Sequence, residues 1–116
     1  MKSLYLVRHA IAADPGGPYP TDEARPLTDD GIQRFRTQVR GLSGLDVTIE
    51  CILTSPLLRC RQTAQLLADG LPGTPRVDVL DDLRPGGRPA DVIEGLGAYR
   101  TVDSIALVGL GYRFVE

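Results

Sequence analysis

The sequence predicts an α/β fold in which a mostly parallel sheet is flanked by helices on both faces. Apolar runs alternate with amphipathic or capped helical segments along the whole chain, which is the pattern of strands joined by helical crossovers. The runs at 3–8 and 104–108 are continuously apolar, as expected for strands buried on both faces. With 116 residues, the chain is expected to form a single domain over 1–116 with a small core.

Composition excludes several functional classes. The net charge is −2, from 13 basic and 15 acidic residues, so no overall field favours nucleic acid or an anionic membrane. No apolar stretch approaches the ~20 residues that span a bilayer, and the first run is broken by Arg8 and His9, unlike a signal peptide. Cys51 and Cys60 lack metal-binding spacing, and one histidine cannot complete a zinc set with them. We therefore expect a cytoplasmic protein with reduced cysteines and neither metal nor cofactor.

The first half of the chain predicts a strand, a loop and a helix. The strand spans 3–8, and the proline- and glycine-rich segment 14–26 is a loop placed to cover whatever binds near Arg8 and His9. Thr28 is expected to cap a helix whose first turn carries two aspartates. That helix has one apolar face and ends near two glycines: Ile32, Phe35, Val39 and Leu42, then Gly41 and Gly44.

The second half predicts three more strands and two helices. A strand over 49–54 leads into Ser55 as a cap and Pro56 near the first helical position. The helix is expected to run to about Ala68 and to end at Gly70, with a buried face of Leu58, Ala64, Leu66 and Leu67. A strand over 77–80, a helix over 90–96 and a strand over 104–108 complete the pattern.

The ends of the strands predict where a functional site lies. In parallel sheets, sites form at the carboxyl ends of strands, where Arg8 and His9, the 55–59 segment and Gly109 are all expected. Two guanidinium groups, Arg8 and Arg59, together with a helix start suit a tetrahedral dianion, and His9 is a candidate nucleophile for phosphorus. On these residues alone, an ordinary α/β domain explains the pattern equally well, because a lone histidine after a strand is more often structural and Arg59 suits a solvated helix face.

Three segments carry a resemblance to a known family. Leu6-Val7-Arg8-His9-Ala10 resembles the Arg-His-Gly signature of the histidine phosphatase superfamily, with alanine where glycine is usual. Residues 25–31 resemble its Arg-Pro-Leu-Thr-x-x-Gly segment, and residues 55–64 its Ser-Pro-x-x-Arg-x-x-Gln-Thr-Ala helix. The chain is most similar to the SixA-type phosphohistidine phosphatases, which have the phosphoglycerate mutase-like fold, and the likeness spans residues 3 to about 109.

The resemblance implies a role for each matching residue. His9 is the nucleophile that becomes phosphorylated, and Arg8 and Arg59 clamp the phosphoryl oxygens. Arg25 and Ser55 are secondary substrate-binding candidates, although a surface arginine or a loop-to-helix salt bridge explains Arg25 nearly as well. For Asp81 and Asp82, candidates for a proton donor, we favour solvated loop charges, because a phosphohistidine leaving group demands little of a general acid.

The implied reaction is hydrolysis of a phosphoryl group through a covalent phosphohistidine intermediate, without a cofactor. The implied substrate is a phosphorylated protein of a bacterial signalling relay or a small phosphorylated molecule. Small-molecule phosphatases and phosphoglycerate mutases of the superfamily usually carry further insertions and a clear glutamate donor, and we find neither in this sequence.

The agreement stops after Gly109. The family continues Val-Gly-His-Glu-Pro, whereas Leu110 stands here in place of the second catalytic histidine. Loss of one such transition-state donor typically lowers the rate by about 10²- to 10³-fold. A truncated or frameshifted reading frame, a degenerate phosphate-binding pseudoenzyme and a gene remnant all explain the ending. An uncovered strand at 104–108 also predicts a less stable domain, or a dimer formed through exposed apolar surface.

Overall fold

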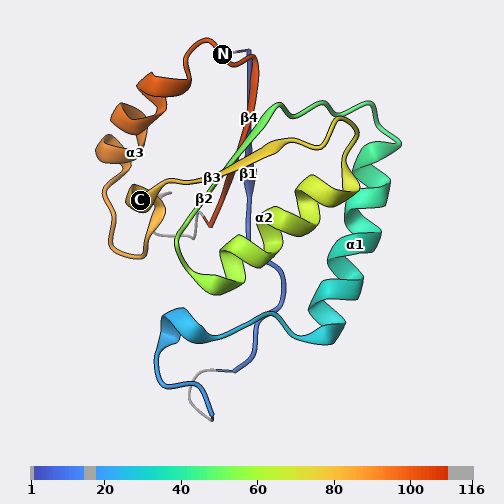
Figure 1. Ribbon diagram of the computed structural model, residues 1–116, viewed down its shortest axis with the longest axis vertical. Helices are drawn as coiled ribbons and strands as arrows, with labels where there is room; N and C mark the ends of the chain where they lie inside the picture. The colour runs from blue at the N-terminus through green and yellow to red at the C-terminus, as the bar shows by residue number, and fades with distance from the viewer. Residues whose placement is uncertain (1, 15–17, 110–116) are drawn as a thin grey trace.

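The computed structural model describes residues 2–14 and 18–109, which form one four-stranded parallel sheet. The strands are β1 (Ser3–Val7), β2 (Cys51–Thr54), β3 (Arg76–Val79) and β4 (Ser104–Val108), in the order β1-β4-β2-β3 (Figure 1). The helices are α1 (Asp29–Ser43), α2 (Leu58–Gly70) and α3 (Pro89–Gly95). Three 3₁₀ turns, η1 (Asp22–Ala24), η2 (Asp81–Leu83) and η3 (Leu96–Tyr99), complete the fold, so the α/β prediction is confirmed.

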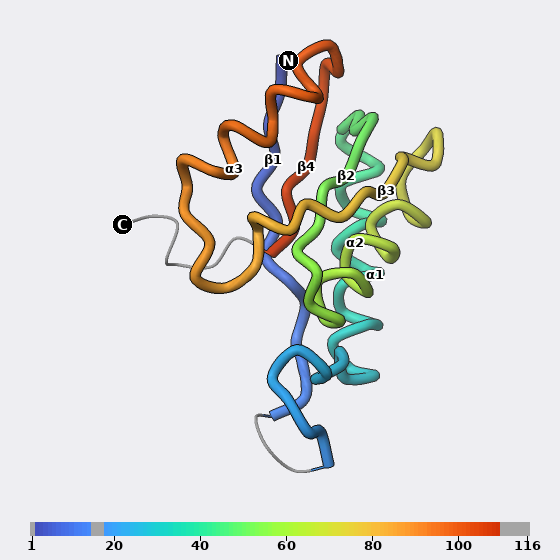
Figure 2. Tube along the Cα trace, turned by 60° about the vertical axis from the view of Figure 1, so that its left-hand side comes forward, coloured from blue at the N-terminus to red at the C-terminus, as the bar shows by residue number. Residues whose placement is uncertain are grey.

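Helices cover both faces of this sheet. Figures 1 and 2 show α1 and α2 on one side of the strands and α3 on the other. The chain runs outward from β1 through α1 to β2 and through α2 to β3, then returns through α3 to β4. Because crossovers between parallel strands are right-handed, this reversal of direction moves α3 to the opposite face.

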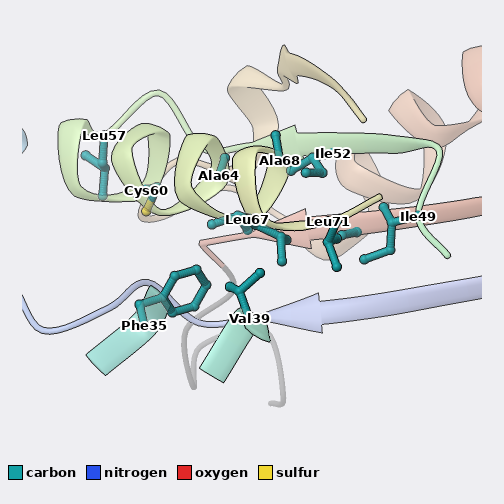
Figure 3. Close-up of a cluster of buried hydrophobic side chains, with 12 residues drawn as sticks. Phe35, Val39, Ile49, Ile52, Leu57, Cys60, Ala64, Leu67, Ala68 and Leu71 are labelled. Atoms are coloured by element: carbon teal, nitrogen blue, oxygen red, sulfur yellow. The ribbon is translucent and has the colours of Figure 1, made fainter. Parts of the chain in front are cut away.

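Each face has its own apolar core. Figure 3 shows Phe35 and Val39 of α1 facing the apolar side of α2. The cluster on that side also includes Ile52 of β2 and Ala106 of β4. On the other face, Leu83 of η2 and Val92 of α3 pack against alternate residues of the two central strands: Cys51, Leu53, Ile105 and Leu107.

The ends of α1 are as the sequence predicts, and the start of α2 is not. The Thr28 hydroxyl accepts a hydrogen bond from the amide of Gly31 at 2.9 Å, and Gly44 is the C-cap. The second helix begins at Leu58 rather than at Pro56. Its N-cap is Leu57 and not Ser55, whose amide instead donates to the Val108 carbonyl at 3.0 Å and so extends the sheet.

The buried face of α2 also differs from the prediction. Leu58 and Leu66 are only half-buried, whereas Ala64 and Leu67 are buried as expected. The remaining buried positions are Arg59, Cys60, Thr63 and Ala68. Two polar side chains therefore lie on the inner side of this helix, close to the carboxyl edge of the sheet.

The prediction that β1 is buried on both faces is wrong. Leu4 is 45% exposed and Leu6 is 66% exposed, while Tyr5 and Val7 pack against the core beneath α1 and α2. Within the described residues β1 pairs only with β4, so it is an edge strand, and α3 lies over β2 and β4. The expected uncovered strand is therefore β1 and not β4, all five residues of which are buried.

Among the residues described, no helix combines the length and the apolar character that crossing a bilayer requires.

Candidate functional site

The carboxyl ends of three strands meet at one edge of the sheet. The Gly109 amide donates to the Val7 carbonyl at 3.1 Å, and the Ser55 amide donates to the Val108 carbonyl at 3.0 Å. These bonds join Gly109 and Ser55, which directly follow β4 and β2, to the last residues of β1 and β4. The convergence expected from element order is therefore present, and Arg8 and His9 directly follow β1 at this edge.

Gly109 closes the end of β4 tightly. Its φ is +110°, a conformation that residues with a Cβ rarely adopt. A Cβ built there would lie 2.7 Å from the Cβ of Ser55 and 3.1 Å from the sulfur of Cys60. Glycine is therefore required for both conformation and space.

His9 is exposed at the end of β1, and its ring is held through one nitrogen. Nδ1 lies 2.7 Å from the carbonyl oxygen of Ala10. A carbonyl only accepts hydrogen bonds, so Nδ1 of the neutral ring carries the proton and Nε2 keeps its lone pair. The ring is thus in the tautomer that an Nε2 nucleophile needs.

A cavity of about 290 Å³ opens beside this ring. Arg8 and His9 line it from the β1 side, and Arg34 and Gln38 line it from α1. Gly31 also borders it, and a Cβ at that position would collide with the Ile11 carbonyl oxygen. The start of α1 therefore packs directly against the chain that follows His9.

Thr63 connects the His9 segment to α2. Its hydroxyl accepts a hydrogen bond from the Ala10 amide at 3.1 Å and donates to the Arg59 carbonyl at 2.7 Å. The neighbouring Gln62 accepts from the Leu27 amide at 2.8 Å. Two adjacent polar residues of α2 thus hold the segments that follow β1 and precede α1.

Arg59 is buried, so it does not belong to a solvated helix face. Its residue is 7% exposed, and its guanidinium is held by Asp22 of η1. Nη1 donates to the Asp22 carbonyl oxygen at 2.9 Å, and Nη2 contacts the carboxylate oxygen Oδ2 at 3.0 Å. Nε is buried and finds no hydrogen-bond partner in the part of the chain that the structure describes. A buried guanidinium needs such a counter-charge, because removing it from water is costly.

Arg25 is paired within its own loop rather than with a helix. Nε and Nη2 each lie 2.8 Å from Oδ1 of Asp22, and Nη1 donates to the Ala13 carbonyl at 2.6 Å. Hydrogen bonds from Arg25 and then from Arg59 hold the pKa of the Asp22 carboxyl below its usual value. Asp22 thus bridges the two arginines that the sequence singles out in separate segments.

The predicted site residues therefore form two groups. Arg8 and His9 share the open cavity, whereas Arg25 and Arg59 are gathered around Asp22. Ser55 is buried, and its hydroxyl accepts a hydrogen bond from the Leu57 amide at 3.3 Å. Asp81 and Asp82 lie in η2, where Asp82 pairs with Arg84 at 3.7 Å, and neither lines the cavity at His9.

Sequence reasoning missed Asp22, Thr63 and Arg34. Asp22 stands three residues before Arg25, and this opposite-charge spacing was the available signal for it. Thr63 belongs to the Gln-Thr-Ala part of the family-like helix, but the sequence pattern assigns it no function. Arg34 gave no signal, because an arginine on the polar side of an amphipathic helix is ordinary.

The two cysteines do not compete with His9 as nucleophiles. Cys51 and Cys60 are buried and unpaired, and burial raises the pKa of each thiol. Over residues 2–14 and 18–109, no three His, Cys, Asp or Glu side chains are grouped to hold a metal ion. His9 is thus the exposed nucleophilic side chain at this edge of the sheet.

Residues 4–85 match the histidine phosphatase superfamily (branch 1). The chain belongs to this superfamily. It is 39% identical over 110 residues to an uncharacterised protein of Picosynechococcus, covering 95% of this chain and 66% of the relative. It is 32% identical over 114 residues to the phosphohistidine phosphatase SixA of Escherichia coli, covering 91% of this chain and 69% of that protein.

The fold matches the same group of the superfamily. A solved structure of the protein histidine phosphatase SixA with tungstate has a TM-score of 0.79 and 33% identity, covering 90% of this chain and 67% of that one. The chain spans about two thirds of the length of these relatives. Leu110, where the resemblance in sequence leads us to expect the second catalytic histidine, lies outside the described residues.

Proposed function

We propose that this protein hydrolyses phosphohistidine in a partner protein through a covalent phosphohistidine intermediate on His9. The observation that carries the proposal is the hydrogen bond between His9 Nδ1 and the Ala10 carbonyl, which in the neutral ring leaves the lone pair on Nε2, together with the cavity that His9 and Arg8 both line. An exposed ring with an oriented lone pair beside a guanidinium suits in-line attack on phosphorus.

The proposed reaction has two steps. His9 Nε2 attacks the phosphorus as the bond from phosphorus to the substrate imidazole breaks, and the leaving ring takes a proton from solvent water. A second water then attacks the phosphorus of phospho-His9, the Nε2–P bond breaks, and inorganic phosphate is released as this water gives up a proton to solvent. Arg8 and Arg59 stabilise the negative charge on the phosphoryl oxygens in both steps.

The relatives support this reaction class. The Escherichia coli relative is a phosphohistidine phosphatase, and a related SixA binds tungstate, a tetrahedral oxyanion. The partner we propose is therefore a phosphorylated protein of a bacterial signalling relay in the cytoplasm.

Hydrolysis of a phosphohistidine peptide tests the proposal. His9→Ala is expected to lower the rate by roughly 10³-fold or more, as loss of a nucleophile does. It should also abolish the acid-labile phosphoryl label on the wild-type protein. Gln65→Ala, an exposed change elsewhere on α2, is the control and should leave both signals unchanged. Equal rates in the wild-type and His9→Ala proteins would exclude His9 as the nucleophile.

A second candidate is a pseudoenzyme that binds phosphate or a phosphorylated partner without turnover. Leu110 in the sequence favours it, as does the engagement of Arg59 by Asp22. Binding of phosphate that disappears in Arg59→Ala, with no hydrolysis of the peptide, would select this candidate over the enzyme.

We also propose that a second copy of the chain covers the outer face of β1. The exposed Leu4 and Leu6 on an edge strand support this, because such strands favour edge-to-edge association. Sedimentation velocity at rising concentration tests it, and a monomer at every concentration would reject it.

A further inference from the structure

Asp22 holds Arg59 in the way that an oxyanion would. Two oxygen atoms of Asp22, the carbonyl oxygen and Oδ2, receive the two terminal nitrogens of the guanidinium at 2.9 and 3.0 Å. Arginine binds phosphoryl groups with the same pair of nitrogens, directed at two oxygens. The donors with which Arg59 is proposed to hold a phosphoryl group are therefore engaged by the protein itself.

The Nε atom shows that Asp22 satisfies Arg59 only in part. Nε is buried and has no hydrogen-bond partner among the described residues, and Arg59 as a whole is 7% exposed. Buried donors in folded proteins are nearly always paired, and an exception marks a group whose partner is absent. Arg59 can therefore still donate one hydrogen bond, from Nε, to an acceptor other than Asp22.

Asp22 is placed so that it can release Arg59 without losing its own counter-charge. Its side chain is 53% exposed, and it belongs to the three-residue turn η1. Arg25 binds the other carboxylate oxygen, Oδ1, with two nitrogens and is itself anchored to the Ala13 carbonyl. Transfer of Arg59 to another anion therefore leaves the Asp22 carboxylate paired with Arg25.

We propose that Asp22 is an internal competitor for the anion site, whose carboxylate occupies Arg59 until an incoming phosphoryl group displaces it. The inference rests on the proposed function, in which Arg59 binds the phosphoryl oxygens. It adds that a phosphoryl group that binds must replace the Asp22 carboxylate on the Arg59 guanidinium. A ligand with two negative charges displaces Asp22 more effectively than a ligand with one.

A competing role and a positioning role for Asp22 predict opposite changes in anion affinity when its negative charge is removed. If Asp22 competes, Asp22→Asn removes both a rival ligand and the repulsion between its carboxylate and the incoming anion. If Asp22 instead holds Arg59 in its productive orientation, the same change weakens anion binding. The sign of the change in affinity therefore decides between the two roles.

Calorimetric titration with inorganic phosphate measures that sign. We expect Asp22→Asn to bind phosphate roughly tenfold more tightly than the wild type, within the usual range of coupling between sites. Asp91→Asn is the matched control, because Asp91 also pairs with an arginine three residues away, at 3.2 Å on the exposed surface of α3, and its affinity should not change. Arg59→Ala should abolish binding in both the wild-type and Asp22→Asn backgrounds.

Each other outcome has a definite meaning. Unchanged or weaker binding by Asp22→Asn, with binding still dependent on Arg59, overturns the competition and leaves the proposed anion site standing. Absence of phosphate binding in both the wild type and Asp22→Asn overturns the anion site and the competition together. Binding by Asp22→Asn alone supports the competition in its strongest form.

Hydrogen exchange on the wild-type protein gives an independent measurement. The amides of Ala24 and Arg25 bond to Thr21 and Asp22 within η1, at 3.2 Å each. Displacement of Asp22 by phosphate is expected to speed exchange at these two amides, since the turn loses its tie to α2. Slower exchange in the presence of phosphate would contradict the proposal, because it would mean that the ligand tightens this contact.

Discussion

Strands β1 and β4 are neighbours in the sheet with closely similar sequences but opposite environments. Leu6 of β1 is paired in register with Leu107 of β4, yet Leu6 is 66% exposed and Leu107 is 2% exposed. β4 lies between two strands and beneath α3, whereas β1 pairs on one side only within the described residues. The position of a strand in the sheet, and not its apolar content, therefore determines its burial.

The carboxyl ends of β1 and β4 also differ in how tightly they are packed. The end of β4 is filled, because Gly109 lies against Ser55 and Cys60 with no room for a side chain. The end of β1 is open, and it presents Arg8 and His9 to a cavity. The candidate nucleophile therefore directly follows the less buried of the two strands, where its ring is exposed.

Truncation of the paired leucines should show the largest difference in stability. Leu107→Ala is expected to lower the free energy of unfolding by about 2–5 kcal/mol, because it leaves a cavity in a packed core. In the monomer at low protein concentration, Leu6→Ala is expected to cost less than about 1 kcal/mol, since most of its side chain is in water there. Urea unfolding of both variants measures the two values. Equal costs would mean that the outer face of β1 is covered in solution.

A methyl group at the end of β4 should have the next largest effect. Gly109→Ala is expected to destabilise the protein by about 2 kcal/mol or more, from the combined strain of its positive φ and the contacts with Ser55 and Cys60. Gly97→Ala in η3 is the matched control, because no more distant part of the described chain comes within 4 Å of its Cβ position, and its cost should stay below about 1 kcal/mol. Thermal unfolding distinguishes the pair, and equal melting temperatures would show that the end of β4 has space.

The smallest expected effect concerns pH and Asp22, which pairs with Arg25 and Arg59 outside the cavity at the end of β1. Arg25 and Arg59 lower the folded-state pKa of Asp22 below the unfolded value of about 3.9. The ion pairs therefore contribute stability that is fully present above that unfolded pKa and is lost as pH falls through the lower, folded pKa. The stability difference between the wild type and Asp22→Asn should be constant near neutrality and shrink below about pH 4. A difference that persists unchanged at the most acidic pH would mean that the charge is not what stabilises this contact.

Sequence patterns predicted helices and strands well where the interactions that form them lie within a few neighbouring residues. The cap at Thr28 and the apolar spacing of Phe35 and Val39 lie within one helix, so neighbouring residues suffice to specify them. The start of α2 was misplaced because Ser55 is engaged by a strand more than fifty residues away along the chain. The site followed the same rule: Arg8, His9 and Arg59 were recognisable from their own segments, whereas Asp22 became relevant only through its contact with Arg59.

By itself, the sequence determined the α/β class, the order of the elements and the residues that carry the candidate chemistry. These depend on periodicity, caps and short motifs, each of which acts over a few neighbouring residues. Only the tertiary structure decided that β1 is an edge strand, that Arg59 is buried and that Asp22 joins it to Arg25. The physical reason is that burial and charge pairing are set by which distant segments pack together, and one segment's pattern does not contain that information.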